Sequence, residues 1–423
     1  MKKIIFICII IFIYHNTFAQ NKISGRITDQ DNLVLPGATV FIPDLNKGTI
    51  ADSNGIYDFT NLPTGKIKIQ CSFIGYLNTI ETIELIGEAV ELNIKLKSTT
   101  IEAGEVVISG FYNSTQHDNA VKIDVLKLDL QTTKNTANFS EVLTRVPGVD
   151  MISKGNGVSK PVIRGLSMND ILVLNNGVRL ENYQYSSHHP LGIDEFGIED
   201  IEIIKGPASL LYGSDAIGGV INLLKEKPAP VNTISGDYNL QLFSNSLGMT
   251  NNFGVKGASK KLFGGIRIGQ KTNADYLQGG GAFIPNSRFS ELSFKANTGY
   301  TDKIGTFNLF YDFNNQKLGM VEDEAIAEVL KRGRKNEVWY EEFNNHLLSS
   351  QNKLYFGKFK LDINSAYQNT ELIHFGEANV HEIQMRLATL TYEAVLHLPS
   401  KINSEYIVGI QGLNQANRNI NGR

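Results

Sequence analysis

The feature that most constrains the fold is a set of long alternating segments in the second half of the chain. Apolar and polar residues alternate along "TFNLFYDFN" (306–314), with Phe310 as the exception, and along "KFKLDIN" (358–364). "HEIQMRLATLTYEAVLHL" (381–398) alternates as well, although its phase slips near Leu390. A period of two is typical of strands with one apolar and one polar face. Because the segments look longer than ordinary strands, they favour a transmembrane β-barrel over a soluble β-sandwich.

The opening of the chain indicates export from the cytoplasm. Lys2 and Lys3 precede an apolar run over residues 4–14, and "TFA" (17–19) ends the segment with small residues. This pattern is typical of a secretory signal peptide, which we expect to occupy residues 1–19. The run is too short to span a bilayer, and no other apolar stretch approaches membrane-helix length. Such an exported chain is either soluble outside the cytoplasm or a membrane β-barrel.

Charge and cysteine content argue against a nucleic-acid-binding protein and against a disulfide-bonded one. The chain has 40 basic and 43 acidic residues, so its net charge of −3 offers no basic surface for nucleic acid. Of the two cysteines, Cys8 lies in the predicted signal peptide and only Cys71 remains after cleavage. We therefore expect no nucleic-acid partner and no internal disulfide, with Cys71 packed as a small apolar side chain.

Residues 20–100 are predicted to form a β-sandwich. The segments "KIKIQCSF" (66–73) and "VELNIKLK" (90–97) alternate without a fault, and turn signals such as "DSNG" and "LPTG" separate the strands. The stretch over 24–76 resembles the carboxypeptidase-regulatory-like domain, a transthyretin-like sandwich. That domain is non-catalytic in the families that carry it, so the resemblance implies no enzyme activity here.

Residues 101–228 combine helix and strand signals. "NFSEVLTRVPGVD" (138–150) opens with a capping box and predicts a helix that ends at Pro147. "ILVLNNGVRLEN" (171–182) holds an Asn-Gly pair between two short strands, which is a strong hairpin signal. "IEIIKGPASLLYGSDAIGGVINLL" (201–224) adds a strand, a glycine-rich turn and another strand. Together these segments predict a compact α+β unit.

In this order, these motifs together with "RVPGVD" (145–150) and "VIRG" (162–165) resemble the plug domain of TonB-dependent outer-membrane receptors. In that family the plug is a globular domain folded inside a 22-stranded barrel. The resemblance implies a mainly β chain with a transthyretin-like β-sandwich, then an α+β plug domain, then an antiparallel transmembrane β-barrel. The glycine run is not a phosphate-binding loop, because Gly219 stands where that motif needs a lysine.

The resemblance assigns roles to several plug residues. Arg164 and Lys205 match family positions, and we expect them to form ion pairs that fix the plug to the barrel, with ligand contact as the alternative. The glycines would let the last plug strands turn tightly beside the barrel wall. These predicted structural residues are Arg164, Lys205, Gly206, Gly213, Gly218 and Gly219.

The segment "EVVIS" just before the plug looks like a TonB box, with an ordinary linker strand as the alternative. A short extended apolar segment is suited to strand addition on the sheet edge of a partner. The resemblance implies that this partner is the periplasmic domain of TonB, the energy-transducing protein. The predicted box comprises Glu105, Val106, Val107, Ile108 and Ser109.

The loop "ENYQYSSHHPLGID" (181–194) is expected to face the outer mouth of the barrel. It holds Tyr183, Tyr185, His188 and His189, and imidazoles beside phenols could ligate zinc or copper or contact an iron chelate. The alternative is that these histidines are merely solvated. Plugs with a histidine here resemble those of metal and siderophore receptors, which implies an iron–siderophore or a metal ion as ligand.

One enzyme hypothesis starts from "HFGEANVH" (374–381). His374, Glu377 and His381 have a spacing that zinc ligands can adopt. They fall between two predicted strands rather than on a catalytic core, and no other nucleophilic or paired-carboxylate constellation stands out. We therefore expect no catalytic residue and no cofactor.

The segment 229–423 predicts about eight or nine strands, at about 20–25 residues for each strand and its connection. A plugged receptor needs 22, so we expect the N-terminal portion of a barrel, from a truncated gene, a frameshift or a partial sequence. The implied function is energised nutrient uptake across the outer membrane of a Gram-negative cell, in contact with its lipid. Receptors for oligosaccharides or peptides and a secreted binding or adhesion protein are the alternatives.

Overall fold

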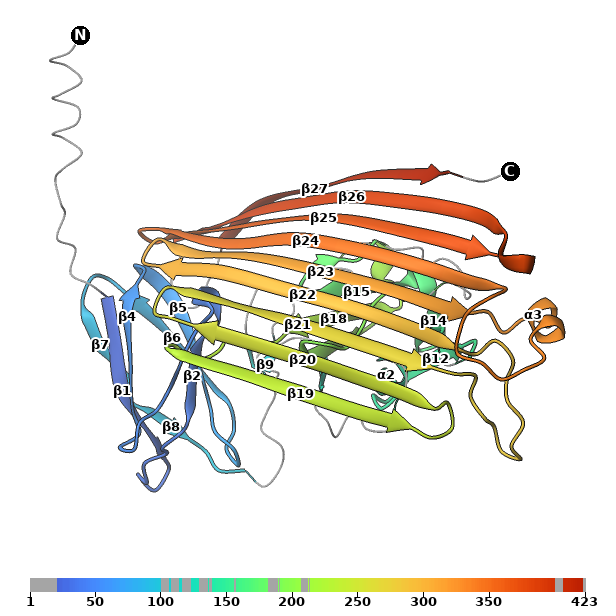
Figure 1. The fold of residues 1–423 in the computed structure, drawn as a ribbon. Helices are drawn as coiled ribbons and strands as arrows, with labels where there is room; N and C mark the ends of the chain where they lie inside the picture. The colour runs from blue at the N-terminus through green and yellow to red at the C-terminus, as the bar shows by residue number, and fades with distance from the viewer. Residues whose placement is uncertain are drawn as a thin grey trace, which may run out of the picture.

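The structure is a computed structural model with three regions, a sandwich, a plug and a large curved sheet (Figure 1). Among the residues that it describes, no helix is both long and apolar enough to cross a membrane. The described residues are 21–99, 106–107, 114–115, 123–128, 136, 139–155, 157–181, 189, 191–206, 212, 214–399 and 406–420. The predicted signal peptide, 1–19, therefore lies outside them.

The sandwich consists of two sheets. One sheet has the strand order β4-β1-β7, with β8 also paired to β1, and the other has the order β3-β2-β5-β6. The elements are β1 (Asn21–Asp29), β2 (Thr39–Ile42), η1 (Pro43–Leu45), β3 (Lys47–Ile50), β4 (Ile56–Leu62), β5 (Gly65–Ser72), β6 (Thr79–Leu85), β7 (Ala89–Glu91) and β8 (Ile94–Leu96).

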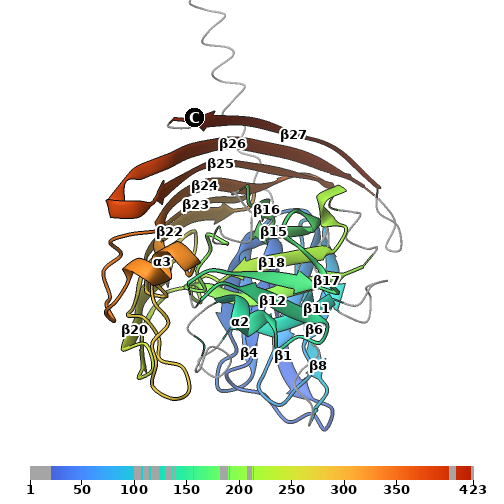
Figure 2. The same cartoon turned by 90° about the vertical axis from the view of Figure 1, so that its right-hand side faces the viewer.

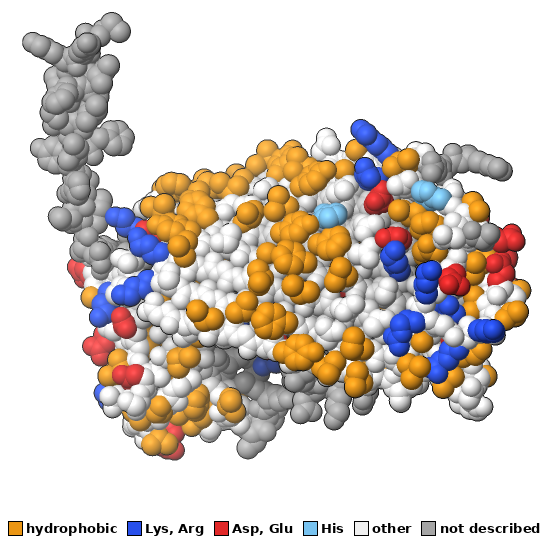
Figure 3. Space-filling view, viewed as in Figure 1, with side chains coloured by type: hydrophobic (Ala, Val, Ile, Leu, Met, Phe, Trp, Pro, Cys, Tyr) orange, Lys and Arg blue, Asp and Glu red, His pale blue; other side chains and the backbone are white. Residues whose placement is uncertain are grey.

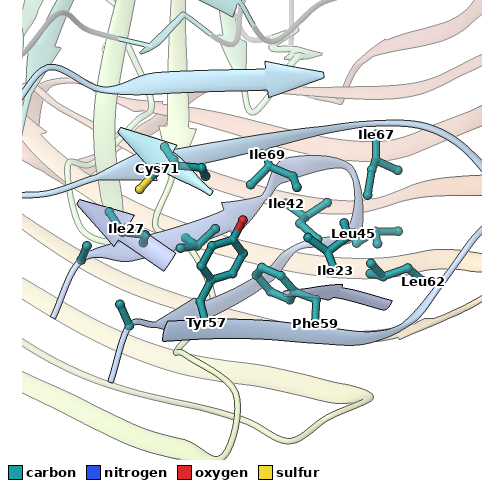
Figure 4. Close-up of a cluster of buried hydrophobic side chains, with 14 of the residues drawn as sticks. Ile23, Ile27, Ile42, Leu45, Tyr57, Phe59, Leu62, Ile67, Ile69 and Cys71 are labelled. Carbon is teal, nitrogen blue, oxygen red and sulfur yellow. The ribbon is translucent and has the colours of Figure 1, made fainter. Parts of the chain in front are cut away.

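The sandwich interior is almost entirely apolar (Figure 4). Ile23 and Ile69 are fully buried between the two sheets, as is Cys71, which confirms that cysteine as a core residue. Burial raises the pKa of the Cys71 thiol to about 12, so the thiol stays protonated and unreactive at neutral pH. The two sheets therefore share one hydrophobic core of the kind that makes a small domain stable.

The strand predicted over 90–97 is interrupted. β7 and β8 pair separately with β1, because the carbonyl oxygen of Leu92 lies directly over Gly25. A Cβ on Gly25 would sit 1.9 Å from that oxygen. The side chain of Asn93 accepts a hydrogen bond from the backbone N–H of Arg26 in place of a ladder bond. Alternation alone does not reveal this break, because the side chains keep their faces on either side of it.

The plug has a five-stranded sheet in the order β11-β17-β18-β15-β16 and a three-stranded sheet in the order β12-β13-β14. β15 and β18 are parallel, and the other pairs are antiparallel. The plug elements are β11 (Ile123–Lys127), α2 (Phe139–Leu143), β12 (Val149–Ser153), β13 (Ser159–Ile163), β14 (Leu166–Ser167), η3 (Met168–Asp170), β15 (Ile171–Asn175), β16 (Val178–Arg179), β17 (Ile198–Lys205), η5 (Ser214–Ala216) and β18 (Gly219–Lys225).

The predicted hairpin at Asn176 and Gly177 is confirmed. Both residues have positive φ, 52° and 81°, as the mirror-image turn of a two-residue hairpin requires. The predicted helix is shorter than expected, since α2 ends at Leu143 and a turn follows before Pro147.

The third region is a nine-stranded antiparallel sheet, which we call the wall. Its strands pair strictly in chain order, and their number agrees with the eight or nine predicted. They are β19 (Thr233–Phe243), β20 (Gly248–Ala258), β21 (Leu262–Asn273), β22 (Phe289–Asp302), β23 (Gly305–Gly319), β24 (Tyr340–Phe356), β25 (Phe359–Phe375), β26 (His381–Leu398) and β27 (Tyr406–Asn419). The wall curves around the plug, which lies on its concave side (Figures 1 and 2).

The two faces of the wall differ in chemistry. On the convex face, large apolar side chains form a broad band, with charged side chains toward its ends (Figure 3). Phe310, the exception in the alternation of 306–314, belongs to the concave face, where Lys225 of the plug lies 4.5 Å from the centre of its ring. The exposed apolar residues include Phe307, Leu309, Leu348, Tyr367, Leu390 and Tyr392.

The connections differ between the two ends of the wall. At one end, called the inner end, residues 259–261, 303–304 and 357–358 join neighbouring strands. At the other, the outer end, the connections include 274–288 and 320–339, and the latter carries α3 (Asp323–Glu328). The sandwich lies at the inner end (Figure 1). Outer-membrane barrels have short turns on the periplasmic side and longer loops outside.

Candidate functional site

His189 of the predicted ligand loop lies against the wall near its outer end. Of the loop's four predicted ligand residues, Tyr183, Tyr185 and His188 lie outside the described residues. His189 is described, and its Nδ1 lies 2.9 Å from Oε1 of Glu341, the second residue of β24. The structure thus gives this plug histidine an acidic partner on the wall, a pairing across 152 residues of sequence.

Glu341 is the centre of a small charged cluster. Its side chain is only 1 % exposed, and Nδ1 of His374 on β25 lies 3.6 Å from the same Oε1. Its other oxygen, Oε2, is buried with no hydrogen-bond partner. Lys160 of β13 is also fully buried, and burial lowers the pKa of this lysine to about 8, although the nearby Glu341 carboxylate raises it. Plug and wall therefore bring two imidazoles, a carboxylate and an amine together near the outer end.

Within the described part of the chain, no group of three or more His, Cys, Asp and Glu side chains is arranged to hold a metal ion. The metal role of His188 and His189 therefore remains a prediction. The residues of the enzyme hypothesis do not converge either. His374 faces Glu341 and Glu382, whereas His381 stacks on Phe375.

Buried ion pairs fix the plug to the wall, but they differ from those predicted. On the wall, Lys271, Lys295 and Arg267 each face an acidic side chain of the plug, and Asp312 faces a plug lysine. The four pairs are Lys271–Glu195 at 2.5 Å, Lys295–Asp194 at 2.6 Å, Lys225–Asp312 at 2.6 Å and Arg267–Glu226 at 3.1 Å. Sequence reasoning missed all four, because the partners are far apart in sequence and no local motif marks them.

The expectation that Lys205 pairs with the wall is wrong. Lys205 ends β17, which pairs with β11, and this neighbour places Asp124 within 2.6 Å of the lysine Nζ. The same amine donates to the carbonyl oxygen of Pro147. Lys205 therefore ties together three segments of the plug itself.

The described contacts of Arg164 lie within the plug, and its predicted ion pair with the barrel stays a prediction. Its backbone N–H donates to the carbonyl oxygen of Gly148, and its guanidinium lies against Gly206, where a Cβ would be 3.2 Å away. Its side chain is exposed, and among the described residues it has no ion pair with the wall. Gly206 has a φ of +90°, which favours glycine at this position.

The glycines of the turn between β17 and β18 are tightly packed, as the sequence suggested. Their neighbours belong to the plug rather than to the wall. A Cβ on Gly219 would lie 2.7 Å from the carbonyl oxygen of Ile204 and 2.9 Å from Ile163. A Cβ on Gly218 would approach Leu166 equally closely. Gly213 lies outside the described residues.

The predicted TonB box is described only in part. Val106–Val107 form β9, which pairs antiparallel with β10 (Ser114–Thr115). Glu105, Ile108 and Ser109 lie outside the described residues. The extended backbone of β9 is the conformation that strand addition requires, and the role of the box remains a prediction.

Two family models match the chain. The model of the TonB-dependent receptor plug domain matches residues 115–220, and that of the CarboxypepD_reg-like domain matches residues 23–108. Residues 115–220 therefore match the plug domain of TonB-dependent receptors. The chain is also 44 % identical over 88 residues to the vitamin B12 transporter BtuB of Photobacterium profundum, a match that covers 21 % of this chain and 14 % of the relative.

Solved receptors share the fold at low sequence identity. The copper transporter OprC aligns with a TM-score of 0.58 at 16 % identity, over 70 % of this chain and 46 % of its own. The siderophore receptor PirA of Acinetobacter baumannii aligns with a TM-score of 0.55 at 17 % identity, over 70 % of this chain and 48 % of its own. The ferric yersiniabactin uptake receptor FyuA of Yersinia pestis aligns with a TM-score of 0.55 at 16 % identity, over 71 % of this chain and 49 % of its own. The chain therefore spans about half the length of these solved receptors.

These matches bear on several expectations from the sequence. The mainly β fold class, with sandwich, plug and barrel-like sheet, is confirmed. TonB-dependent receptors are not enzymes, and the family and its β-barrel relatives indicate the outer membrane as the location. The ligand differs among the relatives, so the comparisons do not choose one.

Proposed function

We propose that this chain is the N-terminal part of an outer-membrane receptor that imports a scarce nutrient with energy supplied through TonB. In this proposal residues 1–19 direct export, 20–100 form the periplasmic sandwich, 101–228 the box and plug, and 229–423 the first strands of the barrel. The observation that carries it is the plug seated on the concave face of the wall. In the complete barrel that we propose, a plug in this position would fill the lumen and could still detach.

The chemistry of the plug–wall contact supports a movable plug. The contact includes buried ion pairs such as Lys225–Asp312 and Lys295–Asp194, beside apolar contacts in which wall residues such as Leu347 join the plug core. Charged groups that leave one another can be rehydrated by lumen water, whereas a separated apolar core would expose its whole surface. A plug held in this way suits repeated opening.

We further propose an iron–siderophore or a metal ion as the ligand. The basis is the cluster around His189, Glu341 and His374 near the outer end, where a ligand from outside would arrive. Imidazole and carboxylate groups recognise transition-metal ions and their chelates. Relatives with the same fold are named as a copper transporter and as siderophore receptors.

Ligand binding tests the first half of the proposal. Cells that produce the receptor are offered copper, zinc, a ferric siderophore, cobalamin, an oligosaccharide and a peptide, and binding is measured for each. His189→Ala should weaken binding of the true ligand, whereas His346→Ala, on the convex face beside Tyr311 and Phe313, should not. Binding of the sugar or the peptide alone would replace the metal hypothesis, and binding of none would favour an adhesion role.

Energised uptake tests the second half. Val107→Pro should abolish strand addition to TonB, because proline lacks the backbone donor. Uptake should then be lost while ligand binding persists, and Val107→Ala should retain uptake. Unchanged uptake in the proline variant would refute the predicted box.

A further inference from the structure

The sandwich is not a loosely tethered domain but contacts the inner end of the wall at several points. Asn46 donates a side-chain hydrogen bond of 3.0 Å to Asn308 on β23. The backbone N–H of Val231, between plug and wall, donates to the carbonyl oxygen of Gly48 at 3.1 Å. The contacts thus hold both the start of the wall and its central strands to one domain.

Asp44 is the strongest of these contacts. It lies in η1 with only 11 % of its side chain exposed, and it accepts a hydrogen bond from Lys353 of β24. Lys360 of β25 lies 3.5 Å from its second carboxylate oxygen, and the Tyr355 hydroxyl lies 3.4 Å from the same atom. Burial alone would raise the pKa of Asp44, but the two lysines outweigh burial and hold it far below its usual value. The carboxylate is therefore charged at every physiological pH.

Apolar packing reinforces this contact. Tyr355 is only 7 % exposed, because its ring packs into the hydrophobic core of the sandwich although it belongs to the wall. At the turn between β24 and β25, the carbonyl oxygen of Gly357 would lie 3.3 Å from a Cβ on Gly65 of the sandwich. Sandwich and wall therefore approach each other as closely as parts of one domain do.

The docked sandwich lies behind the plug along the concave side of the wall. Figure 1 places it at the inner end, and Figure 2, which views the molecule from the outer end, shows the plug in front of it. A solute that passed the plug toward the inner end would next meet the sandwich.

The geometry points to a second closure. The sandwich caps the inner mouth of the lumen, locked to the wall by Asp44 with Lys353, Lys360 and Tyr355, and it must leave this position during import. This inference rests on the proposed function, since a cap matters only if something is imported. It assigns the sandwich a gating role that is separate from that of the plug.

Cross-linking tests the docked position and the need for movement. The double variant Asn46→Cys with Asn308→Cys is treated in whole cells with a short bifunctional thiol reagent, and the single variants are controls. Cys71 is fully buried and should not react. We expect an internal cross-link in the double variant only, with loss of ligand uptake and unchanged ligand binding.

Charge variants test the lock independently. Lys353→Gln with Lys360→Gln removes both partners without touching the sandwich, and Asp44→Asn removes the carboxylate. Both variants should lower the cross-linking yield by at least about tenfold, because a buried carboxylate or amine that loses its partner favours the undocked state. Asp31→Asn, an exposed sandwich residue in a turn, should leave the yield unchanged.

Each outcome decides part of the proposal. No cross-link in the double variant would refute docking, and a cross-link with normal uptake would refute the cap. If the unmodified receptor takes up none of the candidate ligands, the proposed function fails and the gating role fails with it. In that case the cross-link and its dependence on Asp44 would still decide whether the sandwich docks.

Discussion

The sandwich interior and the plug–wall contact differ in how much charge they bury. Inside the sandwich, fully buried side chains such as Ile69 belong to an apolar cluster. Between plug and wall, apolar residues such as Leu347 join the plug core, but lysines such as Lys225 and Lys295 also meet aspartates. Apolar burial stabilises a structure in proportion to its area and is lost all at once, whereas ion pairs fix orientation and can re-form. The difference distinguishes a core held by apolar burial from a contact in which buried charges also set the orientation.

The largest effect is expected in the sandwich interior. Ile69→Ala should lower the free energy of unfolding by about 4 kcal/mol, because it removes buried methyl groups and leaves a cavity. Ile74→Ala is the matched control, since Ile74 is 94 % exposed and its loss should cost under about 0.5 kcal/mol. Pulse proteolysis of the sandwich across a urea series measures both. Equal effects at the two positions would contradict an apolar core as the source of stability.

A somewhat smaller effect is expected at the plug–wall contact. Asp312→Leu should weaken plug retention by about 3 kcal/mol, because it leaves Lys225 buried without its carboxylate. Lys225→Met combined with Asp312→Leu should recover most of this loss. Trypsin sensitivity of the plug across a urea series gives the values for a double-mutant cycle.

The matched control for that cycle is the pair Lys317–Glu342, whose nitrogen and oxygen lie 3.1 Å apart and whose side chains are 43 % and 21 % exposed. Removing both partners there should change retention by less than about 1 kcal/mol. Because Lys317 and Glu342 both belong to the wall, an equal effect would mean that the assay reports the stability of the wall rather than the plug contact.

The smallest effect concerns pH and a single plug carboxyl. Burial, helped by the nearby Glu199, raises the pKa of Asp200 to about 6, and its Oδ1 is buried without a hydrogen-bond partner. Because the folded plug binds this proton more tightly than the unfolded chain does, the contribution of this carboxyl to stability is greatest below pH 4 and is lost as pH rises toward 6. Asp200→Asn should flatten this dependence and stabilise the plug by about 1–2 kcal/mol at pH 8.

Thermal unfolding of the plug between pH 4 and pH 8 measures this dependence, with Asp150→Asn, an exposed residue of β12, as the control. A slope that survives in Asp200→Asn would mean that another group carries the titration. Such a result would also show that burial destabilises the charged Asp200 carboxylate less than expected.

Local signals in the sequence predicted much of the fold. The Asn176–Gly177 pair specified a turn because few residues adopt positive φ, and alternation located the long strands of the wall. Phe310 is an apolar residue on the polar face of its strand, where Lys225 of the plug lies over its ring. That contact cannot be read from the alternation of the strand. The interruption of the strand at Leu92 was also not predicted, because it depends on Gly25 of a different strand.

The site was harder to predict than the fold. Composition and spacing pointed to His189, but its partner Glu341 lies 152 residues away and has no motif around it. Lys205 was assigned to the wrong partner, because a resemblance indicates that a residue matters without saying what it contacts. Only the strand pairing that brings Asp124 beside it settles that question.

The position of Tyr355 has a consequence for protein engineering. Its ring belongs to a wall strand by sequence and to the sandwich core by packing. Deleting the sandwich would therefore leave an aromatic ring bare at the inner end of the wall. Grafting the sandwich onto a wall without Tyr355 would leave a gap in the sandwich core. The two would have to be exchanged together with the turn at Gly357, so the boundary that matters for a chimaera is not the one between domains in the sequence.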